Sequence, residues 1–211
     1  MSSLFRAATS DDMADTVPLI YSSGPAAFDF VFSVPGRASA LDFLRHAFLD
    51  GAGEFGFRNH VVGVQDGAVI AAGAIWSGAS NLAFTLAAAR QITRCYGPLA
   101  GPGVMLRGLR VESVIPPPSG ALCYVAHLGV LPEYRNGGLG VALIQYLIAQ
   151  GRARGLGVAA LDVAATNPRA QALYERLGFV VTRERLSRLA NKQAVVPNHR
   201  RMELGLHTIG R

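Results

Sequence analysis

The chain has 211 residues, a formal net charge of +6 and 50% hydrophobic residues, enough apolar material for one folded domain. No apolar run reaches the roughly 18 residues that a membrane-spanning helix needs, so the sequence gives no sign of such a helix and we expect no membrane partner. The N-terminus lacks the basic and apolar regions of a signal peptide, and Cys95 and Cys123 are too few for a disulfide framework. We therefore expect a cytoplasmic protein with one domain over residues 1–211, as a monomer or a homodimer.

The positive charge is concentrated in the C-terminal part of the chain. Residues 1–130 contain 8 Arg and 9 Asp or Glu, so they net −1, whereas residues 131–211 contain 12 Arg or Lys and 5 Asp or Glu, so they net +7. Such an excess favours a polyanionic ligand, and a solvated basic surface is the plainer alternative. Nucleic acid is a third alternative, but no basic helix interleaved with aromatic residues occurs, so we expect no nucleic-acid partner.

Strand and helix patterns alternate in the first part of the chain. A short strand at 4–8 is followed by a helix that Thr9 or Ser10 caps and that ends near Tyr21. The apolar spacing of residues 39–49 predicts a second helix. Two strands follow, at 60–64 and 69–75, with a hairpin turn between them.

Residues 78–119 form a connection of about forty residues where a hairpin would need only a few. The pattern predicts a helix at 81–96, a turn at Gly97-Pro98, an interruption at 101–103 and a short helix at 104–111. The segment is apolar enough to pack, so we interpret it as a helical insertion that acts as a lid on the substrate side.

The last part of the chain again alternates between strand and helix. The predicted elements are a strand at 121–130, a helix at 139–154, a buried strand at 158–164, a helix at 168–177, and strands at 179–185 and 200–206. We expect the tail after His207 to be loose.

A glycine-rich loop separates the strand ending at Val130 from the following helix. Its sequence is Arg135-Asn136-Gly137-Gly138-Leu139-Gly140. Glycine permits positive φ, and the loop amides, the helix N-terminus and the arginine charge together suit a pyrophosphate. It is not a P-loop, because the only lysine is Lys192, and the dinucleotide pattern fails because Leu143 stands where its third glycine would be. A glycine-rich helix start without a ligand remains the alternative.

Two segments resemble signatures of the GNAT superfamily of N-acetyltransferases. Residues 128–140 resemble its acetyl-CoA-binding motif, with Arg135, Gly138 and Gly140 at the fixed positions. Residues 167–179 resemble its second signature, and 27 positions separate Gly140 from Asn167. The clear resemblance covers residues 122–183, and the first 77 residues match only in outline.

This resemblance implies an α/β (mixed α+β) fold. Its central sheet would be mixed, mostly antiparallel, with about six to seven strands flanked by helices. The implied activity is transfer of an acetyl group from acetyl-CoA, a co-substrate, to a primary amine of a small molecule or peptide by direct attack in a ternary complex. No Asp, His or Glu cluster has metal-ligand spacing, so we expect no metal.

The resemblance also implies roles for individual residues. Leu128, Gly129 and Val130 would separate from the neighbouring strand and pair with the pantothenate arm, and the 135–140 loop would hold the pyrophosphate. Asn167 would bond the arm, or serve as a plain helix cap, or both. Tyr174 would protonate the CoA thiolate, with packing against the sheet as the alternative.

The catalytic base is less well defined by the sequence. Relatives often carry it four or six residues before the motif valine, where this chain has Ala126 and Tyr124. His127 is one step off this register, so it is either a base that a bulge turns into place or a structural histidine. Trp76 could line the acceptor pocket or belong to the core, and His60 has no identified partner.

Two further functions stay open beside the enzyme. A catalytically silent acyl-CoA-binding regulatory domain could use the same fold, because a fold alone does not give activity. The retained Tyr174 favours an enzyme over a silent domain. A basic protein that associates with nucleic acid would instead bind with a steep salt dependence.

Overall fold

The computed structural model describes residues 4–206, and the loose tail expected after His207 lies outside them. Apolar strand patterns give seven strands of one sheet, in the order β1-β2-β3-β4-β5-β7-β6. Among these strands the β4–β5 pair is parallel and the other neighbours are antiparallel. The strands are β1 (Phe5–Ala7), β2 (His60–Gln65), β3 (Ala68–Trp76), β4 (Leu122–Val130), β5 (Val158–Ala164), β6 (Val180–Arg185) and β7 (His199–Gly205).

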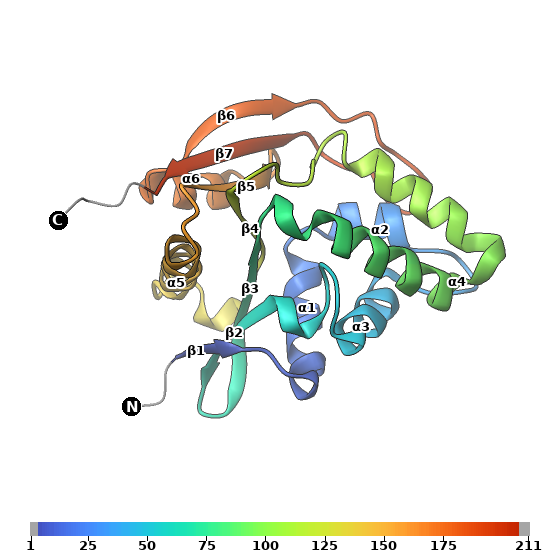
Figure 1. Cartoon of the computed structure of the whole chain (residues 1–211), viewed down its shortest axis with the longest axis horizontal. Helices are drawn as coiled ribbons and strands as arrows, with labels where there is room; N and C mark the ends of the chain where they lie inside the picture. Colours follow the sequence, from blue (N-terminus) through green and yellow to red (C-terminus); the bar gives the residue numbers. More distant parts are fainter. Residues whose placement is uncertain (1–3, 207–211) are drawn as a thin grey trace.

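Helices cover both faces of the sheet, with α1 to α4 on one side and α5 and α6 on the other (Figure 1). They are α1 (Met13–Ser22), α2 (Pro25–Phe32), α3 (Ala40–Asp50), α4 (Asn81–Val111), α5 (Leu139–Ala153) and α6 (Pro168–Arg176). Short 3₁₀ turns lie at η1 (Ser10–Asp12), η2 (Phe57–Asn59), η3 (Gly78–Ser80) and η4 (Pro132–Tyr134). The expected mixed, mostly antiparallel sheet is confirmed. No helix within residues 4–206 has the length and apolarity needed to cross a bilayer.

Each face of the sheet has its own apolar core. Ile20, Phe43 and Phe48 are fully buried in the layer formed by α1 to α4. Leu143 and Leu147 of α5 are fully buried on the opposite face. Burying a side chain of this size contributes roughly 1.5–3 kcal/mol, so the two layers hold the sheet rigidly between them. The face under α1 to α4 is called the acceptor face below, and the other the α5 face.

Local sequence signals explain most of the helix boundaries. The Ser39 hydroxyl accepts a hydrogen bond from the Asp42 amide at 3.2 Å, and the Asp42 carboxylate accepts one from the Ser39 amide at 3.0 Å. This reciprocal cap starts α3, and Gly51 ends it with φ of 78°. The sequence prediction missed α2, whose Pro25 occupies the first turn.

The connection between β3 and β4 is helical, as predicted, but less interrupted. Gly97, with φ 69° and ψ −177°, kinks α4 at the predicted turn. The predicted break at 101–103 is wrong, because the chain stays helical there. Pro98 starts a second helical segment, and Pro102 lies near its beginning. The lack of an N–H group on Pro102 therefore costs only one backbone hydrogen bond. The Tyr96 hydroxyl donates to the Phe32 carbonyl at 2.6 Å, which fixes α4 against α2 on the acceptor face.

Candidate functional site

Strands β4 and β5 separate after a short parallel contact. Residues 122–124 pair with residues 158–160, and beyond that point β5 continues on β7 alone. From Val125 to Val130, β4 pairs with β3 but has no β5 partner among the described residues. Backbone N–H and C=O groups along this edge, apart from the Val130 carbonyl that accepts from Arg135 Nε, are therefore available to a peptide-like ligand.

A bulge in β4 lies at the start of this free edge. Ala74 pairs with Ala126 and Ala72 with Gly129, so His127 and Leu128 both lie opposite Gly73. His127 has φ of 55°, a left-handed conformation that is uncommon outside glycine. The bulge turns His127 to the acceptor face and Leu128 to the α5 face, which supplies the register correction that the sequence pattern required.

The glycine-rich loop connects the free edge to α5. Asn136 and Gly138 have φ of 68° and 83°, and Gly138 is the N-cap of α5. A Cβ added at Gly138 would meet nothing within 4 Å, so the loop surface is open there. The first amides of α5 have no carbonyl partner within the helix and carry its partial positive charge. This geometry suits an anion that approaches the backbone closely.

Two arginines brace the loop. Arg135 Nε donates to the Val130 carbonyl at 2.9 Å, so its side chain turns back to the end of β4. Arg169, in the first turn of α6, donates to the Asn136 side chain. Sequence reasoning missed Arg169, although its place two residues after Asn167 in the second signature was a usable signal.

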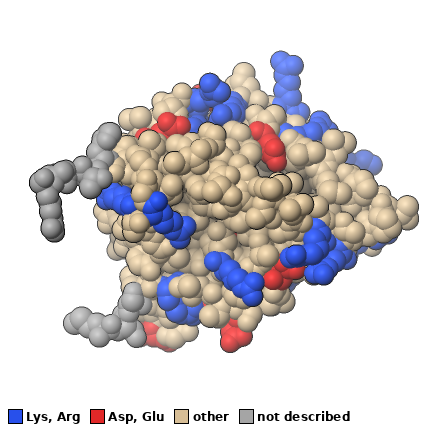
Figure 2. Space-filling model, viewed as in Figure 1, with Lys and Arg blue, Asp and Glu red and all other residues tan. Residues whose placement is uncertain are grey.

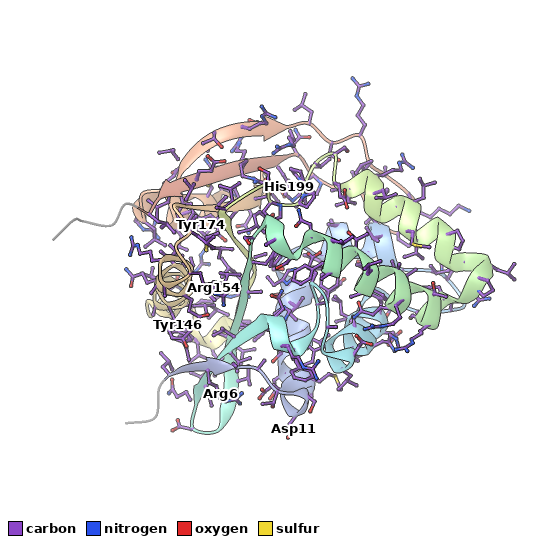
Figure 3. The ribbon with its side chains drawn as sticks, in the orientation of Figure 1. Arg6, Asp11, Tyr146, Arg154, Tyr174 and His199 are labelled. Carbon is purple, nitrogen blue, oxygen red and sulfur yellow. The ribbon has the colours of Figure 1, made fainter. Side chains whose placement is uncertain are left out.

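The second signature folds as α6 and its N-cap. Asn167 Oδ1 accepts a hydrogen bond from the Ala170 amide at 3.1 Å, so its capping role is present. Tyr174 projects on the α5 face, in the same apolar layer as Tyr146 (Figure 3). Its hydroxyl has no hydrogen-bond partner within residues 4–206, and burial raises the pKa of Tyr174 to about 12. The phenol therefore keeps its proton at neutral pH.

An aromatic cluster surrounds His127 on the acceptor face. Its side chain is only 6% exposed and its ring lies 5.2 Å from Phe55 and 5.6 Å from Trp76. Phe84 of α4 packs edge-on against Trp76, with ring centroids 5.7 Å apart. Trp76 thus packs in the core and contacts the histidine, which confirms the core alternative and leaves its role in an acceptor pocket a prediction.

His127 also belongs to a chain of polar contacts. Its Nδ1 lies 3.0 Å from Nε2 of His60, and the His60 Nδ1 lies 2.9 Å from the Gly56 carbonyl oxygen. At the other end, His127 Nε2 lies 3.4 Å from Oε1 of Glu54, whose side chain is 41% exposed. Burial, and then the neighbouring His127, lower the pKa of His60 to about 3. His60, left without a partner by sequence reasoning, is thus tied to the strongest base candidate.

A second polar cluster lies where the strands part. The Tyr124 hydroxyl donates to Asp162 of β5 at 2.8 Å, and Arg201 of β7 donates to both carboxylate oxygens. The Asp162 side chain is only 1% exposed. Burial, followed by the Asp162 charge, raises the pKa of Tyr124 well above its ordinary value, so Tyr124 is a donor here. Sequence reasoning missed Asp162 and Arg201.

The predicted site residues fall on the two faces of the sheet, on either side of the unpaired stretch of β4. The 128–140 segment leads into α5, and Tyr174 lies on the α5 face, whereas His127 lies on the acceptor face. The unpaired stretch of β4 lies between these residues, because its side chains point alternately to the two faces of the sheet. Within residues 4–206, no group of three or more His, Cys, Asp or Glu side chains is arranged to hold a metal ion.

Charge is not gathered into one patch on the visible surface. In Figure 2 the Arg and Lys side chains stand in separate groups around the rim, several beside carboxylates, and the middle of this face is largely uncharged. A continuous basic stripe, as a nucleic acid would require, is absent from the described residues on this face.

Comparisons with known proteins agree with the fold. The sequence pattern described as the acetyltransferase (GNAT) family matches residues 56–179. The ribosomal protein bS18-alanine N-acetyltransferase of Escherichia coli (strain K12) is 45% identical over 53 residues, which are 25% of this chain and 36% of that relative. The chain thus matches about a third of the length of its curated relatives.

Solved structures share the fold across the whole chain. An N-acetyltransferase from Staphylococcus aureus Mu50 has a TM-score of 0.66 at 15% identity, covering 96% of this chain and 100% of that one. A polyamine N-acetyltransferase from Drosophila melanogaster has a TM-score of 0.58 at 18% identity, covering 96% and 99%. With the family pattern matched over more than half of its length, this chain belongs to the acetyltransferase (GNAT) family.

Proposed function

We propose that this protein transfers an acetyl group from acetyl-CoA to a primary amine of a small molecule or peptide, in a ternary complex. The observation that carries the proposal is the unpaired edge of β4, which runs from Val125 directly toward the 135–140 loop. A pantetheine arm can pair with such an edge while its pyrophosphate contacts the loop amides.

The proposed ligand contacts are mostly backbone groups. The segment Leu128-Gly129-Val130 would bind the arm, and the open surface at Gly138 leaves room for phosphate oxygens. Asn167 Oδ1 is used by its helix cap, so its amide nitrogen is the group that remains to bond the arm. Arg169, held at Asn136, would add a positive charge beside the phosphates.

The proposed reaction needs two proton transfers on opposite faces of the sheet. The neutral amine attacks the thioester carbonyl carbon, a C–N bond forms, and the C–S bond breaks. Tyr174, protonated at neutral pH, would give its proton to the departing thiolate. His127 would accept the proton that the amine must lose before it attacks. The α4 segment, through Phe84 against Trp76, would wall the acceptor side.

The runner-up is a silent acyl-CoA-binding domain, and one pair of measurements separates the two. Acetyl-CoA should raise the melting temperature under either function, because it binds the native state. Release of free CoA thiol should occur only with an enzyme, in a screen that includes an N-terminal alanine peptide, a polyamine and agmatine. A thermal shift with no thiol release for any amine contradicts the enzyme, and no shift at millimolar acetyl-CoA contradicts both.

A further inference from the structure

The contacts around His127 fix which of its nitrogens can take a proton. The Gly56 carbonyl oxygen can only accept, so the His60 Nδ1 that lies 2.9 Å from it carries hydrogen. A buried neutral His60 then has a lone pair on Nε2, the atom that lies 3.0 Å from His127 Nδ1. His127 Nδ1 must therefore be the donor, whether the His127 ring is neutral or charged.

The remaining nitrogen of His127 points to a carboxylate. Neutral His127 with hydrogen on Nδ1 has its lone pair on Nε2, which lies 3.4 Å from Glu54 Oε1. Two acceptors this close repel each other, so a donor that lies beside them and gives one N–H to each is favoured. A substrate ammonium group is a donor of that kind, and Glu54 is exposed enough for it to approach.

We propose that the Glu54–His127 pair is the receptor for an amine that arrives as a cation, and that His60 is the positioning residue that fixes the His127 tautomer. This inference rests on the proposed function and adds the charge state of the acceptor and two residues. Glu54 binds the ammonium group, and His127 Nε2 removes its proton. His60 acts only through His127.

The proton balance closes without another reagent. The ammonium N–H bond breaks, and its proton goes to Nε2, giving an imidazolium that forms an ion pair with Glu54. The neutral amine then attacks the thioester carbonyl carbon and the C–S bond breaks. The thiolate takes the Tyr174 proton, and the tyrosinate regains one from the newly formed, still protonated amide nitrogen. The imidazolium finally releases its proton to water beside the half-exposed Glu54.

The surroundings of His127 contain few competing charges. Glu112, at the end of α4, lies near Glu54. Its partial burial and, to a smaller extent, the Glu54 charge raise the pKa of Glu112. A second carboxyl there strengthens the preference for a cationic acceptor. The groups that face His127 are titratable Glu54 and His60 and the uncharged rings of Phe28, Phe55 and Trp76.

The tautomer is testable without any activity. Nitrogen-15 spectra of labelled histidine should show hydrogen on Nδ1 of neutral His127 in the wild-type protein. His60→Gln retains a side-chain oxygen that can accept from Nδ1 and should keep this tautomer, whereas His60→Leu should lose it. Hydrogen on Nε2 of neutral His127 in the wild type would overturn the assignment.

Kinetics then test whether the contacts matter for transfer. With an alkylamine acceptor at pH 7, His60→Leu should lower kcat/KM by about 10²-fold, near the lower end of what a general base contributes, and His60→Gln should restore most of it. An arylamine of low basicity is neutral at this pH and should lose little in either variant. If His60→Leu transfers acetyl to the alkylamine at the wild-type rate with an unchanged pH profile, the positioning role is wrong while the acetyltransferase function stands.

The binding role of Glu54 has its own readout. Glu54→Gln should raise the KM for the alkylamine about tenfold, leave the KM for acetyl-CoA unchanged, and move the acid limb of the rate profile to lower pH. Asp66→Asn, in the β2–β3 turn, removes the same charge elsewhere and serves as the control. An equal change in KM for the alkylamine and the neutral arylamine would overturn the ammonium receptor.

Discussion

The two halves of the candidate site are built in different ways. The loop at 135–140 presents backbone groups from consecutive residues, with Gly138 in a left-handed conformation that its sequence permits. The pair of His60 and His127 instead joins side chains 67 positions apart, held by a bulge in β4. Backbone groups suit a ligand that is the same throughout a family, such as the proposed acetyl-CoA. Side chains brought together from distant segments can differ between family members that use different acceptor amines. The following predictions test that division, beginning with the largest expected effect.

Tyr174→Phe tests the proposed proton donor on the α5 face. The Tyr174 hydroxyl has no hydrogen-bond partner among residues 4–206, so its removal should leave stability nearly unchanged. If it protonates the thiolate, the transfer rate should fall by about 10²–10⁴ while acetyl-CoA affinity stays constant. Steady-state and single-turnover kinetics measure this. Wild-type turnover under conditions where chemistry limits the rate would remove Tyr174 from the mechanism.

Gly138→Asp should damage the backbone half alone. It adds a negative charge and a side chain at φ 83°, where the phosphates are proposed to lie, so the Kd for acetyl-CoA should rise about a hundredfold, or ~2.8 kcal/mol. Calorimetry measures the Kd, and the His127 tautomer should not change.

Two control variants separate charge from strain at this glycine. Gly138→Asn has similar size, no charge, and tolerance of the left-handed region, so it should weaken binding less. Gly155→Asp introduces the same charge and strain at φ 74° in a different turn and should leave the Kd unchanged. An unchanged Kd in Gly138→Asp would show that the phosphates bind elsewhere.

The acid stability of the protein should depend on the assembled half. The pKa of His60 falls from an ordinary 6.5 to about 3 in the folded state, so between these values the unfolded chain binds a proton that the folded chain does not. Stability should therefore fall as pH drops below about 6.5, by about 1.4 kcal/mol per pH unit from this group. Denaturant melts from pH 7 to 4 should show a shallower slope in His60→Gln. Identical slopes would mean that His60 is not buried as a neutral ring.

Asn167 gives the smallest and most specific test. Its side chain caps α6, so Asn167→Ala should lower the free energy of unfolding by about 1 kcal/mol. Asn167→Asp keeps the accepting oxygen but loses the amide N–H donors, so it should retain stability and weaken acetyl-CoA binding if Asn167 also bonds the arm. Equal affinity in the aspartate variant and the wild type would leave Asn167 as a cap only.

The sequence by itself determined the fold class and predicted the backbone half of the candidate site. Capping residues, alternating apolar strands and the two GNAT signatures are local patterns within a few residues of each other, and β5 was predicted with the observed boundaries. Sequence reasoning missed α2, because no strong periodic signal stands between Pro25 and Phe32. It also predicted a break at 101–103, where α4 continues because Pro98 starts a helical segment that holds Pro102 near its beginning.

Only the tertiary structure decided the assembled half. The bulge that turns His127 toward the acceptor face depends on the pairing of β4 with β3, and the partner of His60 depends on β2, β3 and β4 lying side by side. Glu54 reaches the same histidine from the loop after α3. Contacts of this kind arise from sheet register and packing between distant segments, and they leave no spacing pattern along one chain from which they could be read.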